Sequence, residues 1–406
     1  MYRPHRLKFG VFIAPWHRVG ENPTLCFKRD MAVIEHLDWL GYDEAWIGEH
    51  HSFARELISD PVAFITAAAL RTRRIKLGTG VLSLPYHHPL MVADQMLQLD
   101  HITEGRAMLG CGPGALTSDA FMMGIDPADQ RRMMHESLDA IMALFQAKAP
   151  VNMKTDWFTL RDARLQMAMF SEPHIPVSVA ATFTPTGPVA AGKHGLGLLS
   201  VAGADNEAFE RTWGWVEEAA GESGKKVDRG NWRVVMNMHL ADSKREAIAD
   251  VEEGYRRRAY WGDRLDPDAP AANVLAGPTP PASIEEGIER GTMIVGTPDD
   301  AIQAINTLQE RSGGIGGILC FSHEWANTDK TNHSYELLQR FVAPHFQNQL
   351  QPIIENRNWV EGQMQTVFGG LAPAFAKAFT DHGKQPPAPI AAMLEAARKK
   401  ESSAAT

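Results

Sequence analysis

The chain has 406 residues, of which 44% are hydrophobic and 22% charged, close to ordinary globular usage. This composition excludes a chain-long disordered, fibrous or membrane protein, and the length allows two or three average domains or one enlarged domain. A formal net charge of −9 provides no basic surface for polyanions, so nucleic acids and anionic membranes are not expected partners.

The three cysteines, Cys26, Cys111 and Cys320, are widely spaced and odd in number, which argues against a disulfide framework or a zinc knuckle. The apolar run near the N-terminus is too short for a signal-peptide core, and no stretch approaches the ~20 apolar residues that span a bilayer. We therefore expect a cytoplasmic protein that acts on small molecules.

Short β-like runs alternate with amphipathic segments, a pattern typical of βα units around a parallel sheet. The candidate strands are residues 7–14, 42–50, 75–84, 106–112, 177–182, 196–201, 232–240 and 317–323. The helical stretches between them are 24–40, 60–71, 89–102, 127–147, 206–220, 243–260 and 298–312. Eight such units predict an α/β fold, a (β/α)8 TIM barrel with insertions. A doubly wound sheet is the alternative, but no GxGxxG motif follows the first strand.

Three segments interrupt this repeat. Residues 148–170 are predicted to form a hairpin inserted before the fifth strand. Residues 261–292 are rich in proline and glycine and too long for an ordinary connection, which indicates an active-site lid or a disordered excursion; the lid is favoured. We expect residues 1–350 to form the barrel domain and residues 351–406 a helical C-terminal extension with a frayed end.

Histidines recur where the predicted strands end, which is the edge that carries the active site in a barrel. The second strand ends at His50 and His51, the third leads to His87 and His88, and the eighth to His323. A metal hydrolase is one interpretation, but no HExxH motif occurs, and adjacent strand residues point to opposite faces. We predict no metal site, and any single histidine here could equally be structural.

A turn after the fifth strand contains Thr182, Thr184, Thr186 and Gly187 and leads into a helical segment. Its hydroxyls and backbone N–H groups could bind a phosphate, although the same residue types also form helix caps. The third and fourth strands contain the glycine-rich stretches LGTGVL and LGCGPGAL. Such glycines mark either the close approach of a ligand or a β-bulge, and the sequence leaves both open.

Taken together and in this order, the motifs resemble those of the bacterial luciferase-like flavin-dependent monooxygenase family. The resemblance covers about residues 7–346. It rests on the first-strand KFG, on GYDEAWIGEHH, LGTGV and LPYHHP, and on VGTP at 295–298. The stretches GCGPGAL, ATFTPTGPVAAGKHG and RSGGIGGILCFSHEWAN are most similar to limonene monooxygenase-like members and, more loosely, to diketocamphane Baeyer–Villiger monooxygenases.

The resemblance implies a two-component enzyme. Its cofactor would be reduced FMN, supplied by a separate NAD(P)H:flavin reductase, which reacts with O2 to give a flavin hydroperoxide. The substrate would be small and largely apolar, a cyclic terpene or ketone, and the reaction an epoxidation, a hydroxylation or a Baeyer–Villiger insertion. A homodimer is also implied. A deazaflavin-dependent oxidoreductase of the same fold and a non-catalytic flavin-binding protein remain alternatives.

By motif position, the resemblance places His50 beside the flavin as the catalytic residue, for proton transfer or for stabilising the peroxide, with His51 as a weaker second. The predicted cofactor-binding residues are Thr79, Gly80, Val81, Gly112, Thr182, Thr184, Thr186 and Gly187, with a non-proline cis peptide at Gly80–Val81. One departure is Pro113, which stands where luciferases place a phosphate-binding arginine. Apolar candidates for the barrel mouth are Phe12, Trp16, Phe183, Met236, Met238 and Phe321, although each could equally be an ordinary core residue.

Overall fold

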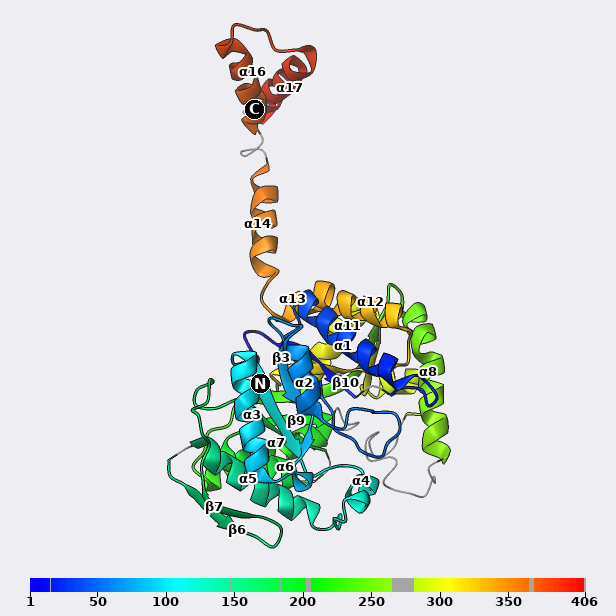
Figure 1. Cartoon of the computed structure of the whole chain (residues 1–406). Coiled ribbons are helices and arrows are strands. Elements are labelled where there is room, and N and C mark those ends of the chain that lie inside the picture. Colours follow the sequence, from blue (N-terminus) through cyan, green and yellow to red (C-terminus); the bar gives the residue numbers. More distant parts are fainter. Residues whose placement is uncertain are drawn as a thin grey trace. The chain divides into compact units, whose positions relative to one another are not determined.

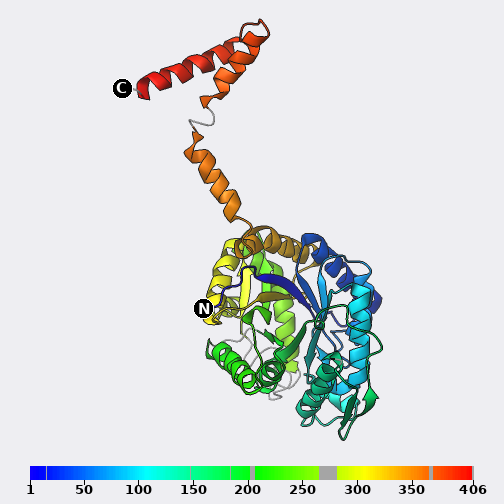
Figure 2. The same ribbon diagram turned by 90° about the vertical axis from the view of Figure 1, so that its left-hand side faces the viewer.

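Eight parallel strands close into a barrel within residues 1–347 (Figures 1 and 2). The computed structural model describes residues 1–14, 16–146, 148–182, 184–201, 206–264, 281–364 and 369–404. The barrel strands are β1 (Lys8–Ile13), β2 (Glu44–Ile47), β3 (Lys76–Thr79), β5 (Ala107–Gly112), β8 (Val177–Ala181), β9 (Gly197–Val201), β10 (Trp232–Leu240) and β12 (Gly317–Phe321). The ring closes because β1 pairs with both β2 and β12, and β9 with β10. The predicted TIM barrel is confirmed.

Helices cover the outside of the barrel (Figure 2). The longer ones are α1 (Pro23–Leu40), α2 (Pro61–Ala69), α3 (Pro89–Thr103), α5 (Gln130–Gln146), α6 (Thr186–His194), α7 (Asn206–Glu222), α8 (Lys244–Arg264), α11 (Pro298–Arg311) and α12 (Thr328–Leu337). Their starts follow from local chemistry. The Asn22 side chain caps α1, and Thr297 and Asp300 form a capping box at α11. Four of these helices begin with proline, which suits the first helical position.

Shorter elements lie in the connections. They are β4 (Leu82–Ser83), η1 (Leu84–Tyr86), α4 (Thr117–Met122), η2 (Arg229–Asn231), α10 (Ile284–Glu289), the π-helical η3 (Leu338–Val342) and α13 (Ala343–Phe346). Within 148–170, β6 (Val151–Lys154) and β7 (Thr159–Ala163) form an antiparallel hairpin. Both views place this hairpin at the opposite end of the barrel unit from α12 and α13 (Figures 1 and 2).

The structure contains one strand that the sequence analysis did not anticipate, β11 (Met293–Gly296). It pairs with residues 237–240 of β10, whereas residues 233–236 of β10 pair with β12. The long β10 therefore pairs with β12 along its first half and with β11 along its second half. Of the predicted lid, residues 265–280 lie outside the described residues, and the described remainder contains the end of α8 and α10.

A buried ion pair and an indole ring fill the barrel interior. The Arg233 guanidinium donates two hydrogen bonds of 2.8 Å to the Glu44 carboxylate, and the Trp46 indole donates a third of 3.0 Å. Burial alone would raise the pKa of Glu44, but Arg233 lowers it to about 2. Above the pair, a Cβ at Gly78 would lie 2.8 Å from the Trp46 ring, and one at Gly110 would lie 3.0 Å from it. Gly78 therefore accommodates the protein's own indole, whereas a Cβ at Gly110 would first overlap the Thr79 carbonyl oxygen, 2.1 Å away.

The larger apolar core lies between the strands and the helices. Met236 and Met238 belong to this layer, so the prediction that they line the barrel mouth is wrong. Residues alternate across a strand, and their neighbour Val235 is the one that faces the interior beside Trp46. Cys111 is fully buried in the same core layer. The candidate Phe183 lies outside the described residues.

Residues 348–406 form a separate helical unit. It consists of α14 (Gln351–Gly362), α16 (Leu371–Asp381) and α17 (Ala388–Ala404), of which α16 and α17 pack against each other. Throughout the described residues, no helix is both long enough and apolar enough to cross a membrane.

Candidate active site

His50 lies just beyond β2, at the barrel mouth, the edge formed by the carboxyl ends of the strands. Its Nδ1 is 3.4 Å from Oδ2 of Asp119, and its Nε2 is 3.3 Å from Oε2 of Glu56. Burial alone would lower the pKa of His50, but these two carboxylates, with Glu49 nearby, outweigh it and raise the pKa. The arrangement favours the doubly protonated imidazolium.

Asp119, on the short helix α4, fixes three consecutive residues after β2. Besides its contact with His50, its carboxylate accepts hydrogen bonds from the backbone N–H of His51, at 3.1 Å, and from the Ser52 hydroxyl. Burial would raise the pKa of Asp119, but the hydrogen bonds from His50 and Ser52 lower it. Neither Asp119 nor Glu56 was singled out from the sequence, because no short motif links either carboxylate to the histidine.

Glu49 organises the opposite side of this turn. Its side chain is fully buried and accepts a 2.6 Å hydrogen bond from the backbone N–H of Ser83. Nε2 of His87 lies 2.5 Å from the same carboxylate, and Nε2 of His51 lies 3.3 Å from it. His51 and His87 are thus held away from His50, in agreement with the alternation expected along a strand.

The floor of the barrel mouth is flat and apolar. The peptide bond Gly80–Val81 is cis, at the position predicted from the sequence. Val81, Phe12 and Phe321 are partly buried and pack on the interior cluster around Trp46. The rings of Phe12 and Phe321 stack, with their centroids 5.8 Å apart. An apolar floor beside a polar histidine can hold a planar ring and exclude water.

Glycine allows the residues of this floor to pack closely, and the Thr79 side chain holds two of its strands together. A Cβ at Gly80 would lie 3.0 Å from the Phe12 ring, and one at Gly112 would lie 2.8 Å from Cγ2 of Val81. The hydroxyl of Thr79 donates a 2.6 Å hydrogen bond to the carbonyl of Gly110 and accepts one of 3.0 Å from its N–H. The side chain of Thr79 therefore joins β3 to β5, and only its backbone continues into the floor.

The turn after β8 places Thr182, Thr184, Thr186 and Gly187 around the start of α6. No side chain caps this helix, so the alternative that these residues are simple helix caps is not supported. The first N–H groups of a helix have no partner within it, and together with the helix dipole they favour an anion. A Cβ at Gly187 would overlap the carbonyl oxygen of Ala180, so glycine is required for α6 to approach β8 this closely.

The loop after β5 contributes no cation to this turn. The carbonyl of Pro113 accepts a 2.9 Å hydrogen bond from the Gln130 side chain, which also donates to the Tyr86 hydroxyl at 3.0 Å. Among the described residues, no group of three or more His, Cys, Asp or Glu side chains could hold a metal ion.

Comparison with known proteins identifies the family. Residues 7–314 match the model of the luciferase-like monooxygenases, more than half of the chain. The chain belongs to this family. It is 44% identical over 357 residues to limonene 1,2-monooxygenase of Rhodococcus erythropolis, covering 87% of this chain and 90% of the relative. It is also 41% identical to 4-hydroxyprotoasukamycin monooxygenase of Streptomyces nodosus subsp. asukaensis, covering 88% of this chain and 97% of that protein.

Among solved structures, the oxygenating constituent of 3,6-diketocamphane monooxygenase from Pseudomonas putida, in complex with FMN, superimposes with a TM-score of 0.72. It is 27% identical, and the match covers 83% of this chain and 98% of that one. This luciferase-like family member is thus an oxidoreductase on the same barrel.

Proposed function

We propose that this luciferase-like monooxygenase is the oxygenating component of a two-component system. It would bind reduced FMN supplied by a separate NAD(P)H:flavin reductase and use O2 to oxygenate a small, ring-bearing and largely apolar substrate. Flavin-dependent oxidation follows from the family. The observation that carries the proposal is that the barrel mouth combines an apolar floor, formed by Phe12, Val81 and Phe321, with a histidine whose pKa is raised by two carboxylates.

The residues present fit a flavin mononucleotide. A planar ring would lie on Gly80, Val81 and Gly112, where side chains are absent or apolar. Its phosphate would take the backbone N–H groups at the start of α6. The hydroxyls of Thr182, Thr184 and Thr186 would be further donors to it. When bound, the reduced flavin supplies the electrons that activate O2, while the protein supplies orientation and a dry environment.

His50 then has a defined role. Asp119 and Glu56 contact its two ring nitrogens and raise its pKa, which favours the protonated, cationic ring at the barrel mouth. Such a cation stabilises negative charge that develops on oxygen, and it can transfer a proton without passing through bulk water. Phe12 and Phe321 exclude water from the same space.

A separate reductase is supported by the absence of a dinucleotide-binding GxGxxG motif after the first strand. An apolar ring-bearing substrate is supported by the aromatic floor. It is also supported by two relatives whose names give limonene and diketocamphane as their substrates. These two relatives are named for 1,2- and 1,6-monooxygenation, so the type of oxygenation here is left to experiment.

The test is a coupled assay with a flavin reductase, NADH, FMN and isotopically labelled O2, offering limonene and a bicyclic diketone in turn. We expect one labelled oxygen atom in the product, and a loss of about 100-fold in His50→Gln. His101→Gln, on α3, is the matched control and should keep full activity. NADH consumption that yields only hydrogen peroxide, or turnover with a deazaflavin in the absence of O2, would contradict the proposal.

A further inference from the structure

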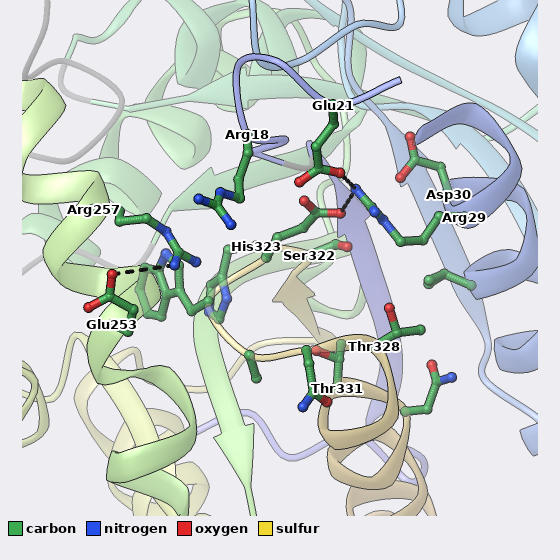
Figure 3. Close-up of a pocket in the computed structure, with 16 residues that line it drawn as sticks. Arg18, Glu21, Arg29, Asp30, Glu253, Arg257, Ser322, His323, Thr328 and Thr331 are labelled. Carbon is green, nitrogen blue, oxygen red and sulfur yellow. Dashed lines mark hydrogen bonds and ion pairs between the residues drawn. The ribbon is translucent and has the colours of Figure 1, made fainter. Parts of the chain in front are cut away.

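A cavity of about 400 Å³ opens beside the barrel mouth, between the loop after β1, the helices α1 and α8, and the start of α12 (Figure 3). A second cavity of about 180 Å³ adjoins it. The two share Arg18, Arg257, Glu324 and Trp325. Neither cavity is lined by the residues assigned above to flavin binding.

The second cavity has an excess of positive charge. Arg18, Arg55 and Arg257 line it, and its one carboxylate belongs to Glu324. That carboxylate is already engaged, because it pairs with Arg29 and lies 3.1 Å from Nδ1 of the buried His17.

The three arginines differ in their surroundings. Arg257 pairs with Glu253 at 3.5 Å, as the dashed line in Figure 3 shows. The Arg18 side chain points into the cavity, and its guanidinium has no hydrogen bond or ion pair with any residue that the structure describes. Burial, and then Arg257, lowers the pKa of Arg55, so the cations repel one another across the cavity. An anion between them would relieve this repulsion.

A first row of aromatic rings lies between this cavity and His50. Trp16 lines the cavity, and the Arg55 guanidinium lies 5.6 Å from its ring. The Trp16 ring is 5.1 Å from that of Phe53, which in turn is 5.9 Å from the His50 ring.

A second row leads from the floor of the mouth to the same cavity. The Phe321 ring, stacked on Phe12, lies 6.3 Å from His323, which stacks on Trp325 at 3.4 Å. Trp325 lines both cavities. Two rows of rings therefore lie between the floor of the mouth and the arginines.

We propose that the substrate carries a carboxylate, bound by Arg18, Arg55 and Arg257, at the far end of an apolar ring-bearing body that lies between the two aromatic rows. This inference rests on the proposed function, because it describes what reaches the oxygenation site. Arginine suits a carboxylate since its planar guanidinium forms paired hydrogen bonds with both oxygens. The aromatic walls bind the apolar body and orient its distal end toward His50.

The experiment compares two probes that differ in one group. Perillyl alcohol is neutral, and perillic acid has a carboxylate in place of the hydroxymethyl group. Binding of each to the flavin-free full-length protein is followed by quenching of tryptophan fluorescence, which Trp16 and Trp325 would report. The variants are Arg18→Gln/Arg257→Gln, the single Arg55→Gln in case the double variant does not fold, and Arg357→Gln on α14 as an exposed control.

We expect the wild-type protein and Arg357→Gln to bind the acid more tightly than the alcohol. The cavity variants should lose about tenfold in affinity for the acid and keep their affinity for the alcohol. Equal binding of the two probes, or equal weakening of both in the cavity variants, would overturn the proposal. Competition by inorganic phosphate as effective as that of the acid would also overturn it, since the site would then bind anions of any kind.

The oxidation of bound reduced FMN by O2, measured without substrate, separates this inference from the proposed function. It should be unchanged in the arginine variants. If the wild-type protein does not bind reduced FMN, the proposed function fails whatever the probes show. If it binds and reacts but does not distinguish acid from alcohol, only the carboxylate site fails.

Discussion

At the scale of single residues, the account depends on the protonation of His50 between Asp119 and Glu56. The pKa of His50 is raised above 6.5 in the folded protein. Protonation of this ring therefore adds to stability below pH 6.5, and the contribution is lost as the pH rises through the higher folded-state pKa. The same shift extends the protonated form of the ring to higher pH.

Replacing Asp119 by asparagine tests this dependence. Asp119→Asn removes a negative charge and keeps the size of the side chain, so the pKa of His50 should fall. The alkaline limb of the pH profile for oxidation of bound reduced FMN should then move to lower pH, with a rate loss of about tenfold at neutral pH.

The control is Asp129→Asn, whose carboxylate pairs with the exposed Arg132 and does not contact His50. It should leave the profile unchanged. An unaltered profile in Asp119→Asn would show that this carboxylate does not set the charge of the histidine.

At the scale of elements, the close contact of α6 with β8 positions the predicted phosphate site. Gly187→Ala places a Cβ against the Ala180 carbonyl and should displace the start of the helix. We expect the affinity for reduced FMN to fall by about tenfold or more, and the affinity for riboflavin, which lacks the phosphate, to change much less.

Gly214→Ala, within α7, is the matched control, because a Cβ there meets no atom within 4 Å. This variant should bind both flavins normally and be slightly more stable, since alanine favours a helix. Equal losses of FMN and riboflavin affinity in Gly187→Ala would argue against a phosphate site at this helix.

Most elements could be predicted because the periodicity of hydrophobic residues and the positions of proline and glycine indicate the same boundaries along the chain. Pro23, Pro61, Pro89 and Pro298 each start a helix at the expected place. The strand β11 was missed because its residues 293–296 directly precede the N-cap of α11. In the sequence they were therefore interpreted as the segment that leads into this helix. Pairing with the far half of β10 is a tertiary feature that no local pattern contains.

The candidate site could be predicted only for residues that belong to a sequence motif at the end of a strand. The cis Gly80–Val81 bond was expected from the resemblance to the family, and the sequence left open whether the turn before α6 binds a phosphate or caps the helix. Asp119 joins His50 across 69 positions, a distance that no spacing rule covers. Gly78 accommodates the Trp46 ring and Gly110 the Thr79 carbonyl, which only the packed barrel shows.

At the scale of the whole molecule, the barrel unit is complete at residue 347. The backbone N–H of Leu7 donates to the carbonyl of Phe346 at 3.0 Å, and the Gln347 side chain donates to the carbonyl of Leu7 at 3.1 Å. The chain ending at 347 should therefore fold and bind reduced FMN like the full chain.

A chain ending at residue 345 provides the comparison. It loses both contacts with Leu7 and the Phe346 ring beside Phe9, so its free energy of unfolding should fall by at least about 2 kcal/mol in denaturant titrations. If the chain ending at 347 does not bind reduced FMN, residues 348–406 are part of the functional unit, and the division of the chain at residue 347 is wrong.

The central claim is that this family member binds reduced FMN and uses it with O2. The most direct measurement is an anaerobic titration of the full-length protein with reduced FMN, followed by rapid mixing with O2 while the flavin spectrum is recorded. The account predicts saturable binding and a long-lived absorbing species that precedes oxidised flavin and decays faster when substrate is added. Failure to bind reduced FMN, together with tight binding of a deazaflavin, would contradict it.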